Sequence, residues 1–324
     1  MALAAQMKAH GGPEVIEWVE VDLPPPGAGE VRFATRAVGL NYIDTYHRRG
    51  IYPVPLPSGL GMEAAGVVEA VGEGVTGFAP GDRVATFGPV LGAYATARNL
   101  PGAALFKLPD GVDDRTAAAA LLKGCTVEFL VERCAHVEAG WPVLVHAAAG
   151  GVGLLLVQWL KHVGATVIGT VGSEEKAEIA RAAGADHIIL YRDEEIAPRV
   201  RELTGGAGVR VTFDGIGMAT WAASLDATGR RGLIASYGNA DAPVGGVDLG
   251  ILARKGSLFS TRPTLFDYYT TPDERAAGSA RLFDLLACGV LKVTIGQTYA
   301  LQDAAQAHRD LEGRATTGST LLLP

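Results

Sequence analysis

The chain has 324 residues and is 48% hydrophobic, which predicts two packed domains. A formal net charge of −7, with no run of basic residues, argues against nucleic acid or an anionic membrane surface as the main partner. The three cysteines are widely spaced, and the N-terminus lacks the basic head and apolar run of a signal peptide, so we expect a cytoplasmic protein.

Residues 1–121 are predicted to form short strands joined by turns. Phrases such as Gly72-Glu73-Gly74 and Pro80-Gly81-Asp82 are typical of turns. Short strands at this spacing predict a small, irregular β-barrel. The expected strands span residues 15–21, 30–37, 66–71 and 82–86.

Residues 122–261 change to a strand–helix–strand rhythm. Such alternation predicts an α/β fold with a parallel, doubly wound sheet of the Rossmann type, whose ligands bind at the carboxyl ends of the strands. The expected strands span residues 143–145, 166–171, 187–191, 209–213, 232–237 and 257–261. The expected helices between them span residues 152–163, 174–183, 194–204 and 218–227.

The tail returns to the first pattern, with helices over 273–288 and 303–311 and strands over 294–299 and 319–323. The first domain is therefore expected to be discontinuous, formed by residues 1–121 plus 262–324. The domain over residues 122–261 is inserted into it.

The stretch 142–153, PVLVHAAAGGVG, joins a buried strand to an apolar helix through a glycine-rich turn. Gly150, Gly151 and Gly153 leave the backbone bare where a pyrophosphate would meet the first amides of the helix. Ala148 stands where G-x-G-x-x-G has its first glycine. The alternative is a tight strand-to-helix turn, as in any α/β domain.

The end of the second strand of this unit carries Gly172, Ser173 and Lys176, with no carboxylate at the strand tip. An acidic residue there usually binds the ribose 2′-hydroxyl of NAD. Ser173 and Lys176 instead favour a 2′-phosphate and hence NADPH. The alternative is that Ser173 is only an N-cap and Lys176 a solvated helix residue.

Segments along almost the whole chain resemble the zinc-free medium-chain dehydrogenases/reductases, and within them the NADPH-dependent quinone oxidoreductases related to zeta-crystallin. The segments that carry the resemblance include GLNYIDTYHRRGIYP (39–53), GMEAAGVVEAVGEGV (61–75), LVHAAAGGVGLLLVQWLK (144–161), GTVGSEEKA (169–177) and KGSLFSTRPT (255–264). The resemblance implies a GroES-like catalytic domain built from both ends of the chain, a Rossmann-type domain for NADPH, and a quinone as substrate.

The resemblance also implies a set of cofactor contacts. With the glycines of the turn, the residues expected to bind NADPH are Asn41, Ile43, Thr126, Gly150, Gly151, Val152, Gly153, Gly172, Ser173, Lys176, Tyr191, Ser236, Tyr237, Gly238, Asn239, Arg262 and Arg314.

Asn41, Tyr46 and Tyr52 lie on the segment expected to face the cofactor, and we predict that they hydrogen-bond the reduced oxygen of the acceptor or flank its ring. The alternative makes the two tyrosines packing residues of a loop and Asn41 a turn residue.

Zinc is not expected. Zinc-dependent relatives carry a cysteine in the region of Asn41 and a Gly-His-Glu where this chain has Gly61-Met62-Glu63. A thioether is a poor zinc ligand. The histidines lack metal-ligand spacing, and His146 is expected to be a core histidine beside the glycine turn.

Two other functions stay open: a reductase of activated C=C bonds such as 2-alkenals and enones, and a non-enzymatic nucleotide-binding protein. The stretch 255–262 resembles the strand that joins subunits edge to edge in this superfamily, so a homodimer is expected.

Overall fold

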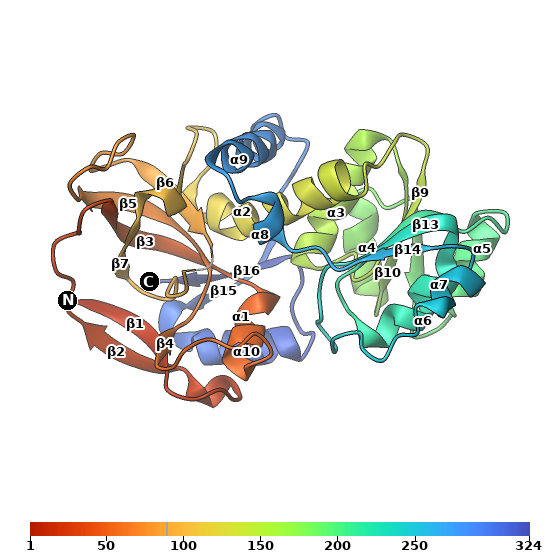
Figure 1. Ribbon diagram of the computed structural model, residues 1–324, viewed down its shortest axis with the longest axis horizontal. Helices are drawn as coiled ribbons and strands as arrows, with labels where there is room; N and C mark the ends of the chain where they lie inside the picture. Colours follow the sequence, from red (N-terminus) through yellow and green to blue (C-terminus); the bar gives the residue numbers. More distant parts are fainter. Residues whose placement is uncertain (89) are drawn as a thin grey trace. The chain divides into compact units, whose positions relative to one another are not determined.

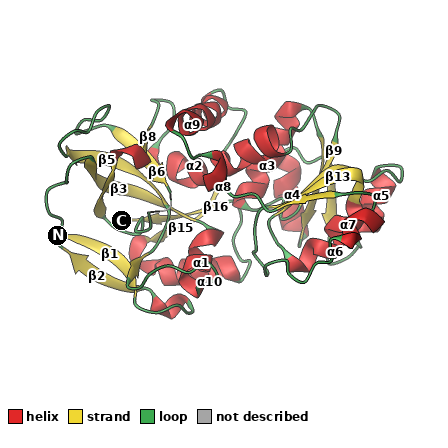
Figure 2. Cartoon of the chain, in the orientation of Figure 1, coloured by secondary structure: helices red, strands yellow, loops and turns green. Residues whose placement is uncertain are grey.

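The computed structural model describes residues 1–88 and 90–324. It contains two compact units (Figure 1). The first comprises Met1–Cys125, Thr270–Ala287 and Val293–Pro324, and the second comprises Thr126–Tyr269 and Cys288–Lys292. Figure 2 shows that the first unit is rich in strands, whereas strands and helices alternate in the second.

The first unit holds two sheets, and in the larger one all neighbours are antiparallel except β15 and β16. Its order is β15 (Ile295–Ala300), β16 (Ser319–Leu323), β3 (Glu30–Leu40), β5 (Glu63–Val71), β6 (Arg83–Phe87) and β8 (Leu105–Lys107), and β7 (Ala97–Pro101) also pairs with β3. The smaller sheet has the order β2 (Glu17–Val21), β1 (Ala2–Met7) and β4 (Ser58–Gly59). The predicted irregular GroES-like β-domain is confirmed, although among the described residues the strands do not pair into a closed ring.

Strand β3 positions the candidate site of the first unit. Its first half alternates, with Val31 and Phe33 in the core, and its second half is continuously buried. In this second half Val38 to Leu40 pair with β16 on one side, while Val38 and Gly39 pair with β5 on the other. The residue that follows, Asn41, therefore leaves the sheet from a buried position.

The second unit is a six-stranded parallel sheet in the order β11 (His187–Leu190), β10 (Thr166–Val171), β9 (Pro142–Val145), β12 (Val209–Asp214), β13 (Thr228–Ser236) and β14 (Phe259–Thr261). Its helices include α3 (Gly151–Val163), α4 (Glu174–Ala182), α5 (Ile196–Leu203), α6 (Met218–Ala227), α7 (Gly250–Arg254) and α8 (Leu265–Tyr268). The strand order reverses between β9 and β12, so right-handed crossovers place α3 and α4 on the face opposite α6. This confirms the doubly wound prediction.

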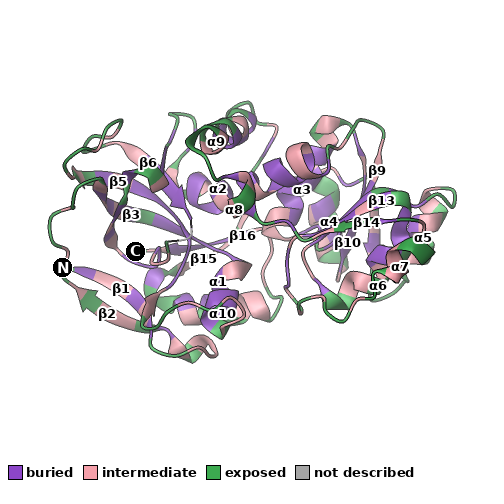
Figure 3. Cartoon of the chain, viewed as in Figure 1, coloured by how far each residue is buried: buried purple, intermediate pink, exposed green. Residues whose placement is uncertain are grey.

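The burial of side chains explains which helices and strands could be predicted from the sequence and which could not. Strands β9 and β10 are buried almost throughout, as is typical of a parallel sheet covered on both faces (Figure 3). Helix α2 (Asp114–Glu128) was not predicted, because Ala117 to Leu121 are all fully buried and leave no polar face to set a helical period. The first unit also contains α1 (Tyr42–Arg49), α9 (Pro272–Ala287) and α10 (Ala304–Glu312).

Two observations concern the expected surroundings of the protein. Cys125, Cys134 and Cys288 are all free thiols. Among the described residues, no helix combines the length and the apolar character that a membrane crossing needs.

Candidate functional site

The glycine turn follows β9 and forms the start of α3. Ala147 has φ of 53°, and its carbonyl accepts the N–H of Gly150 at 2.9 Å, which closes the turn. A Cβ on Gly153 would lie 2.2 Å from the same carbonyl oxygen. The helix can approach the turn this closely only because residue 153 is glycine.

Ala148 replaces the usual first glycine without opening the turn. It is fully buried, and its N–H donates to the carbonyl of Thr170 at 3.1 Å. Gly169 on β10 makes room, since a Cβ there would lie 2.7 Å from the Cβ of Ala148. The space that the Ala148 side chain needs is therefore provided by the absence of a side chain at Gly169 on β10.

His146 fixes the tip of β9 through buried side chains. Its Nδ1 lies 3.1 Å from Thr170 Oγ1, and its Nε2 lies 3.1 Å from Ser224 Oγ. Ser224 donates to Asp214 at 2.7 Å, so its oxygen accepts from His146 Nε2–H, and His146 Nδ1 accepts from Thr170. Burial lowers the pKa of His146. The expected core histidine is confirmed.

The end of β10 is organised by Ser173, the N-cap of α4. Its Oγ accepts the backbone N–H of Lys176 at 3.4 Å, so the N-cap interpretation is confirmed. A cap oxygen at this point already lies where an anion would meet the helix. Glu174 pairs with Arg181 at 2.5 Å. Tyr191 lies beside Gly172, because a Cβ on Gly172 would be 2.5 Å from the tyrosine hydroxyl.

The structure brings most of the predicted residues of the second unit to one edge of its sheet. Carboxyl ends of parallel strands share an edge, and the predicted residues follow five of these ends. Gly150, Gly151, Val152 and Gly153 follow β9; Gly172, Ser173 and Lys176 follow β10; Tyr191 follows β11; Ser236, Tyr237, Gly238 and Asn239 end or follow β13; and Arg262 follows β14. Thr126 is the exception and lies in α2.

In the first unit, Asn41 directly follows β3 and is the N-cap of α1. Its backbone N–H donates to Asp44 Oδ2 at 2.9 Å, and its side-chain amide donates to the carbonyl of Gly39 at 3.1 Å and to Glu63 Oε2 at 2.8 Å. The side chain is therefore held in one orientation at the end of the strand.

Glu63 and Lys123 complete this group, and neither was predicted as a site residue. Glu63 is fully buried, and its Oε2 lies 3.3 Å from the ammonium of Lys123, which is 5% exposed. Its other oxygen accepts the N–H of Leu122 at 2.7 Å. Asn41, Asp44, Glu63 and Lys123 are called the Asn41 cluster below.

A chain of buried hydrogen bonds leads away from the cluster. Tyr94 donates to Asp44 Oδ2 at 3.0 Å, and its oxygen lies 3.0 Å from His308 Nε2. Arg48 lies 2.8 Å from His308 Nδ1 and holds Glu312 through two contacts of 2.8 and 2.7 Å. An arginine can only donate, so His308 carries its proton on Nε2 and donates to Tyr94. Every bond of this chain thus has a fixed direction.

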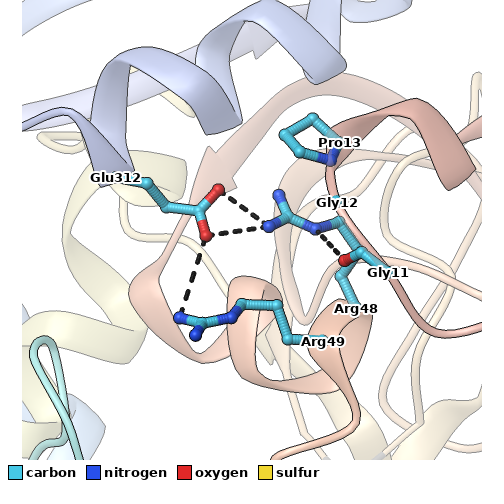
Figure 4. A pocket seen from close by; sticks show the side chains of 6 residues that line it. All are labelled: Gly11, Gly12, Pro13, Arg48, Arg49 and Glu312. Carbon is cyan, nitrogen blue, oxygen red and sulfur yellow. Dashed lines mark hydrogen bonds and ion pairs between the residues drawn. The ribbon is translucent and has the colours of Figure 1, made fainter.

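The chain ends at a pocket of about 320 Å³ (Figure 4). Arg48 points between the carbonyl of Gly11 and the carboxylate of Glu312, and Arg49 approaches Glu312 from the other side at 4.0 Å. Gly12 and Pro13 complete the lining. Burial, reinforced by the charge of Arg48, lowers the pKa of His308 to about 3, so the ring stays neutral.

Asp44 gives a prediction about pH. Burial is the main cause that raises its pKa to about 7; Glu63 also raises it, while the Asn41 N–H, Tyr94 and Lys123 lower it. Because the folded-state pKa is raised, its protonation stabilises the fold fully below pH about 4, and this stabilisation is lost as pH rises through 7. Asp44→Asn stays neutral at every pH. We therefore expect its free energy of unfolding to rise relative to that of wild type by on the order of 2 kcal/mol as the pH increases from 5 to 7.

The measurement is urea unfolding of both proteins across this pH range. His308 titrates in the opposite sense and is present in both, so the difference isolates Asp44. Parallel stability curves for variant and wild type would contradict the assignment.

The two candidate tyrosines pack against each other. The rings of Tyr46 and Tyr52 meet edge to face, with centroids 5.3 Å apart, and Tyr46 is 5% exposed. Ile43 is half-buried on α1, and Arg314 is exposed after α10 with φ of 60°. The two tyrosines therefore make the packing contact that the alternative interpretation expects.

Comparisons with known proteins agree with this architecture. A family model described as "Zinc-binding dehydrogenase" matches residues 151–267, and one described as "Alcohol dehydrogenase GroES-like domain" matches residues 27–110. A quinone oxidoreductase of Salmonella typhimurium is 51% identical, with 100% of both chains covered. The chain belongs to the quinone oxidoreductase family. Another member, the solved Escherichia coli quinone oxidoreductase complexed with NADPH, has a TM-score of 0.97 at 47% identity, covering 99% of this chain and 100% of that one.

Members of this group do not all carry the same name. A 2-haloacrylate reductase from Burkholderia sp is 47% identical, with 100% of this chain and 99% of the relative covered. Relatives of similar identity are thus named for different acceptors, a quinone and a 2-haloacrylate.

The quinone oxidoreductase family shares its nucleotide domain with proteins that the matching model describes as zinc-binding. In this member, no three His, Cys, Asp or Glu side chains within residues 1–88 and 90–324 lie where they would hold a metal ion together. Asn41 and Glu63, from the two segments compared above with zinc-dependent relatives, instead lie together with the ammonium of Lys123.

Proposed function

We propose that this protein reduces quinones with NADPH and uses no metal. The observation that carries the proposal is the bare turn at the start of α3, in a chain 51% identical over its full length to a quinone oxidoreductase. The residues fit a pyrophosphate: Gly150 has no side chain to cap the helix, and the first turn, Gly151, Val152 and Gly153, carries no carboxylate.

We propose that the cofactor is held by the residues that follow the strand ends of the second unit. Gly172, Ser173, Lys176 and Tyr191 would bind the adenosine phosphate, since a serine cap, an ammonium and a phenol hydroxyl suit a phosphoryl group. The remaining contacts proposed are Asn41, Ile43, Thr126, Gly150, Gly151, Val152, Gly153, Ser236, Tyr237, Gly238, Asn239, Arg262 and Arg314. The bound nicotinamide supplies a hydride.

We propose that the acceptor meets Asn41, Tyr46 and Tyr52. A quinone delocalises incoming charge over conjugated oxygens, so the protein must mainly orient the ring and exclude water. The amide of Asn41 is fixed by Gly39 and Glu63, and the paired tyrosine rings offer an aromatic surface. In this proposal residues 1–121 plus 262–324 form the catalytic domain and residues 122–261 the NADPH domain.

The direct test is NADPH oxidation against a panel of quinones and enones, with NADPH binding followed by its fluorescence. We expect turnover with 1,4-benzoquinone to exceed turnover with enones. Reduction of activated C=C bonds is the second candidate, favoured by the 47% identical 2-haloacrylate reductase, and faster turnover of enones would establish it instead. NADPH binding without oxidation of any acceptor would indicate a nucleotide-binding protein.

Lys176 gives a prediction about cofactor choice. Lys176→Ala removes the ammonium near the cap of α4, and we expect the ratio of kcat/KM for NADPH to that for NADH to fall roughly tenfold. Lys161→Ala is the matched control, because this lysine of α3 is paired with Asp186 at 2.7 Å. A ratio that Lys176→Ala leaves unchanged would refute the phosphate assignment.

We further propose a cytoplasmic homodimer. Strand β14 is the edge of the six-stranded sheet, and Phe259 on it is 62% exposed, which suits pairing with a second copy of the same edge. Free cysteines, one of them exposed, suit a reducing compartment. A monomeric mass by light scattering at micromolar concentration would contradict the dimer.

A further inference from the structure

Lys123 is a buried cation next to the residue proposed to meet the acceptor. Its ammonium lies 3.3 Å from Glu63 Oε2, and the same oxygen accepts the amide of Asn41 at 2.8 Å. An ammonium has three N–H donors. Among the residues that the structure describes, Glu63 accepts from one of them, so two remain to meet a ligand.

Reduction of a quinone needs a proton as well as a hydride. Addition of a hydride to the quinone gives the quinol monoanion, and an O–H bond must then form at the anionic oxygen. If an ammonium supplies this proton, its N–H bond breaks, the lysine is left as a neutral amine, and solvent returns one proton per turnover. The sum is NADPH, one proton and quinone giving NADP⁺ and quinol.

Most polar atoms of the other residues in the Asn41 cluster already have hydrogen-bond partners. The Asn41 amide is not an acid, and both oxygens of Glu63 accept hydrogen bonds. Asp44 Oδ2 accepts from the Asn41 N–H and the Tyr94 hydroxyl, whereas Asp44 Oδ1 is buried without a hydrogen-bond partner among the described residues. Asp44, whose pKa is raised to about 7, can also carry a proton, but it is fully buried, whereas Lys123 is 5% exposed and keeps two unused donors.

We propose that Lys123 is the acid that protonates the reduced quinone oxygen, with Glu63 as the residue that positions it. This inference rests on the proposed quinone reductase function. Glu63 Oε2 holds the ammonium and the Asn41 amide side by side, so that a free N–H of Lys123 would meet the reduced oxygen next to Asn41. Buried Glu63 is itself located by the Leu122 N–H and by Gly39, where a Cβ would lie 2.4 Å from Glu63 Oε2.

The first test reads the charge of Lys123 without turnover. 4-Nitrophenol, an analogue of the quinol, absorbs differently as phenol and phenolate, and its ionisation is titrated on the protein with NADP⁺ present. We expect wild type to lower the pH of ionisation of the bound phenol by about one unit, as a nearby cation does. Lys123→Met is expected to abolish this shift.

The second test measures whether turnover depends on proton transfer to the reduced quinone. Lys123→Met is expected to slow reduction of electron-rich quinones, whose quinols are weak acids, by roughly a hundredfold. Tetrachlorobenzoquinone, whose quinol is a much stronger acid, should be affected far less. Lys123→Arg keeps the charge but holds its proton too tightly to transfer it, so it should preserve the phenol shift and lose turnover.

Controls separate this role from structure. Lys107→Met removes a lysine of the same unit that is paired with Asp82 at 3.0 Å, and it should change neither readout. If Lys123→Met fails to fold because Glu63 is left unpaired, Lys123→Met/Glu63→Gln removes both charges and should lose the shift as well.

The outcomes are distinct. An unshifted phenol on wild type, or equal losses for all quinones in Lys123→Met, would overturn the role of Lys123 while leaving quinone reduction intact. Wild-type protein that oxidises no NADPH with any quinone would instead overturn the proposed function.

Discussion

Gly153→Ala is expected to abolish tight NADPH binding and to destabilise the second unit. The new Cβ would lie 2.2 Å from the Ala147 carbonyl oxygen and 2.9 Å from two backbone atoms of Ala148. The first turn of α3 must therefore move away from the end of β9. Two or more hydrogen bonds from its amides to a phosphate would be lost, which corresponds to roughly 3 kcal/mol, or about a hundredfold in affinity.

The same substitution is expected to lower the free energy of unfolding by roughly 1–3 kcal/mol, as overpacking does. The two effects are measured separately, by fluorescence titration with NADPH and by urea unfolding without it. Gly245→Ala is the control, because a Cβ there meets nothing within 4 Å. Wild-type affinity in Gly153→Ala would show that the turn is only a strand-to-helix connection.

The second unit was predictable because its signals are local. Each buried parallel strand is a short apolar run that ends in a turn, as with Thr166 to Val171 before Gly172. The helix over Met218–Ala227 and the strand over Ser319–Leu323 were predicted to the residue. Strand β13 begins at Thr228, four residues before the predicted Gly232, because it follows α6 without an intervening turn.

The Asn41 cluster was only partly predictable. Asn41 was predicted from the family resemblance, which places its segment against the cofactor, but Glu63 and Lys123 lie 60 positions apart and meet only in the folded unit. The departure Gly61-Met62-Glu63 was visible, yet it was interpreted as the loss of a zinc ligand and not as the place of an ion pair. Lys123 lies in an alanine-rich helix that gave no periodic signal.

The hydrogen-bonded chain beyond Asp44 was hidden for the same reason. Arg48 and His308 are 260 positions apart, and Tyr94 and His308 are 214 apart. Nothing local distinguishes a histidine whose pKa falls to about 3 from one on the surface. Only the fold shows that α1, α10 and the segment around Tyr94 enclose one polar core.

Arg48→Met is expected to lower the free energy of unfolding by roughly 3–5 kcal/mol, as removal of one partner of a buried charged pair does. Arg48 is 1% exposed and donates to Gly11, to His308 and to both oxygens of Glu312. Its loss leaves the carbonyl of Gly11 and the Nδ1 of His308 without this donor. Denaturant unfolding at pH 7 measures the change.

Arg49→Met is a closely matched control, because it alters the next residue of α1 and the same partner, Glu312. Arg49 is 46% exposed, and its guanidinium lies as far as 4.0 Å from the carboxylate of Glu312. Its loss should therefore change the free energy of unfolding by less than about 1 kcal/mol. Equal effects of the two substitutions would mean that the charge of Glu312 matters and the buried chain does not. A large effect of Arg48→Met alone, lessened in Arg48→Met/His308→Leu where the orphaned acceptor is also gone, would assign the energy to the hydrogen bond between them.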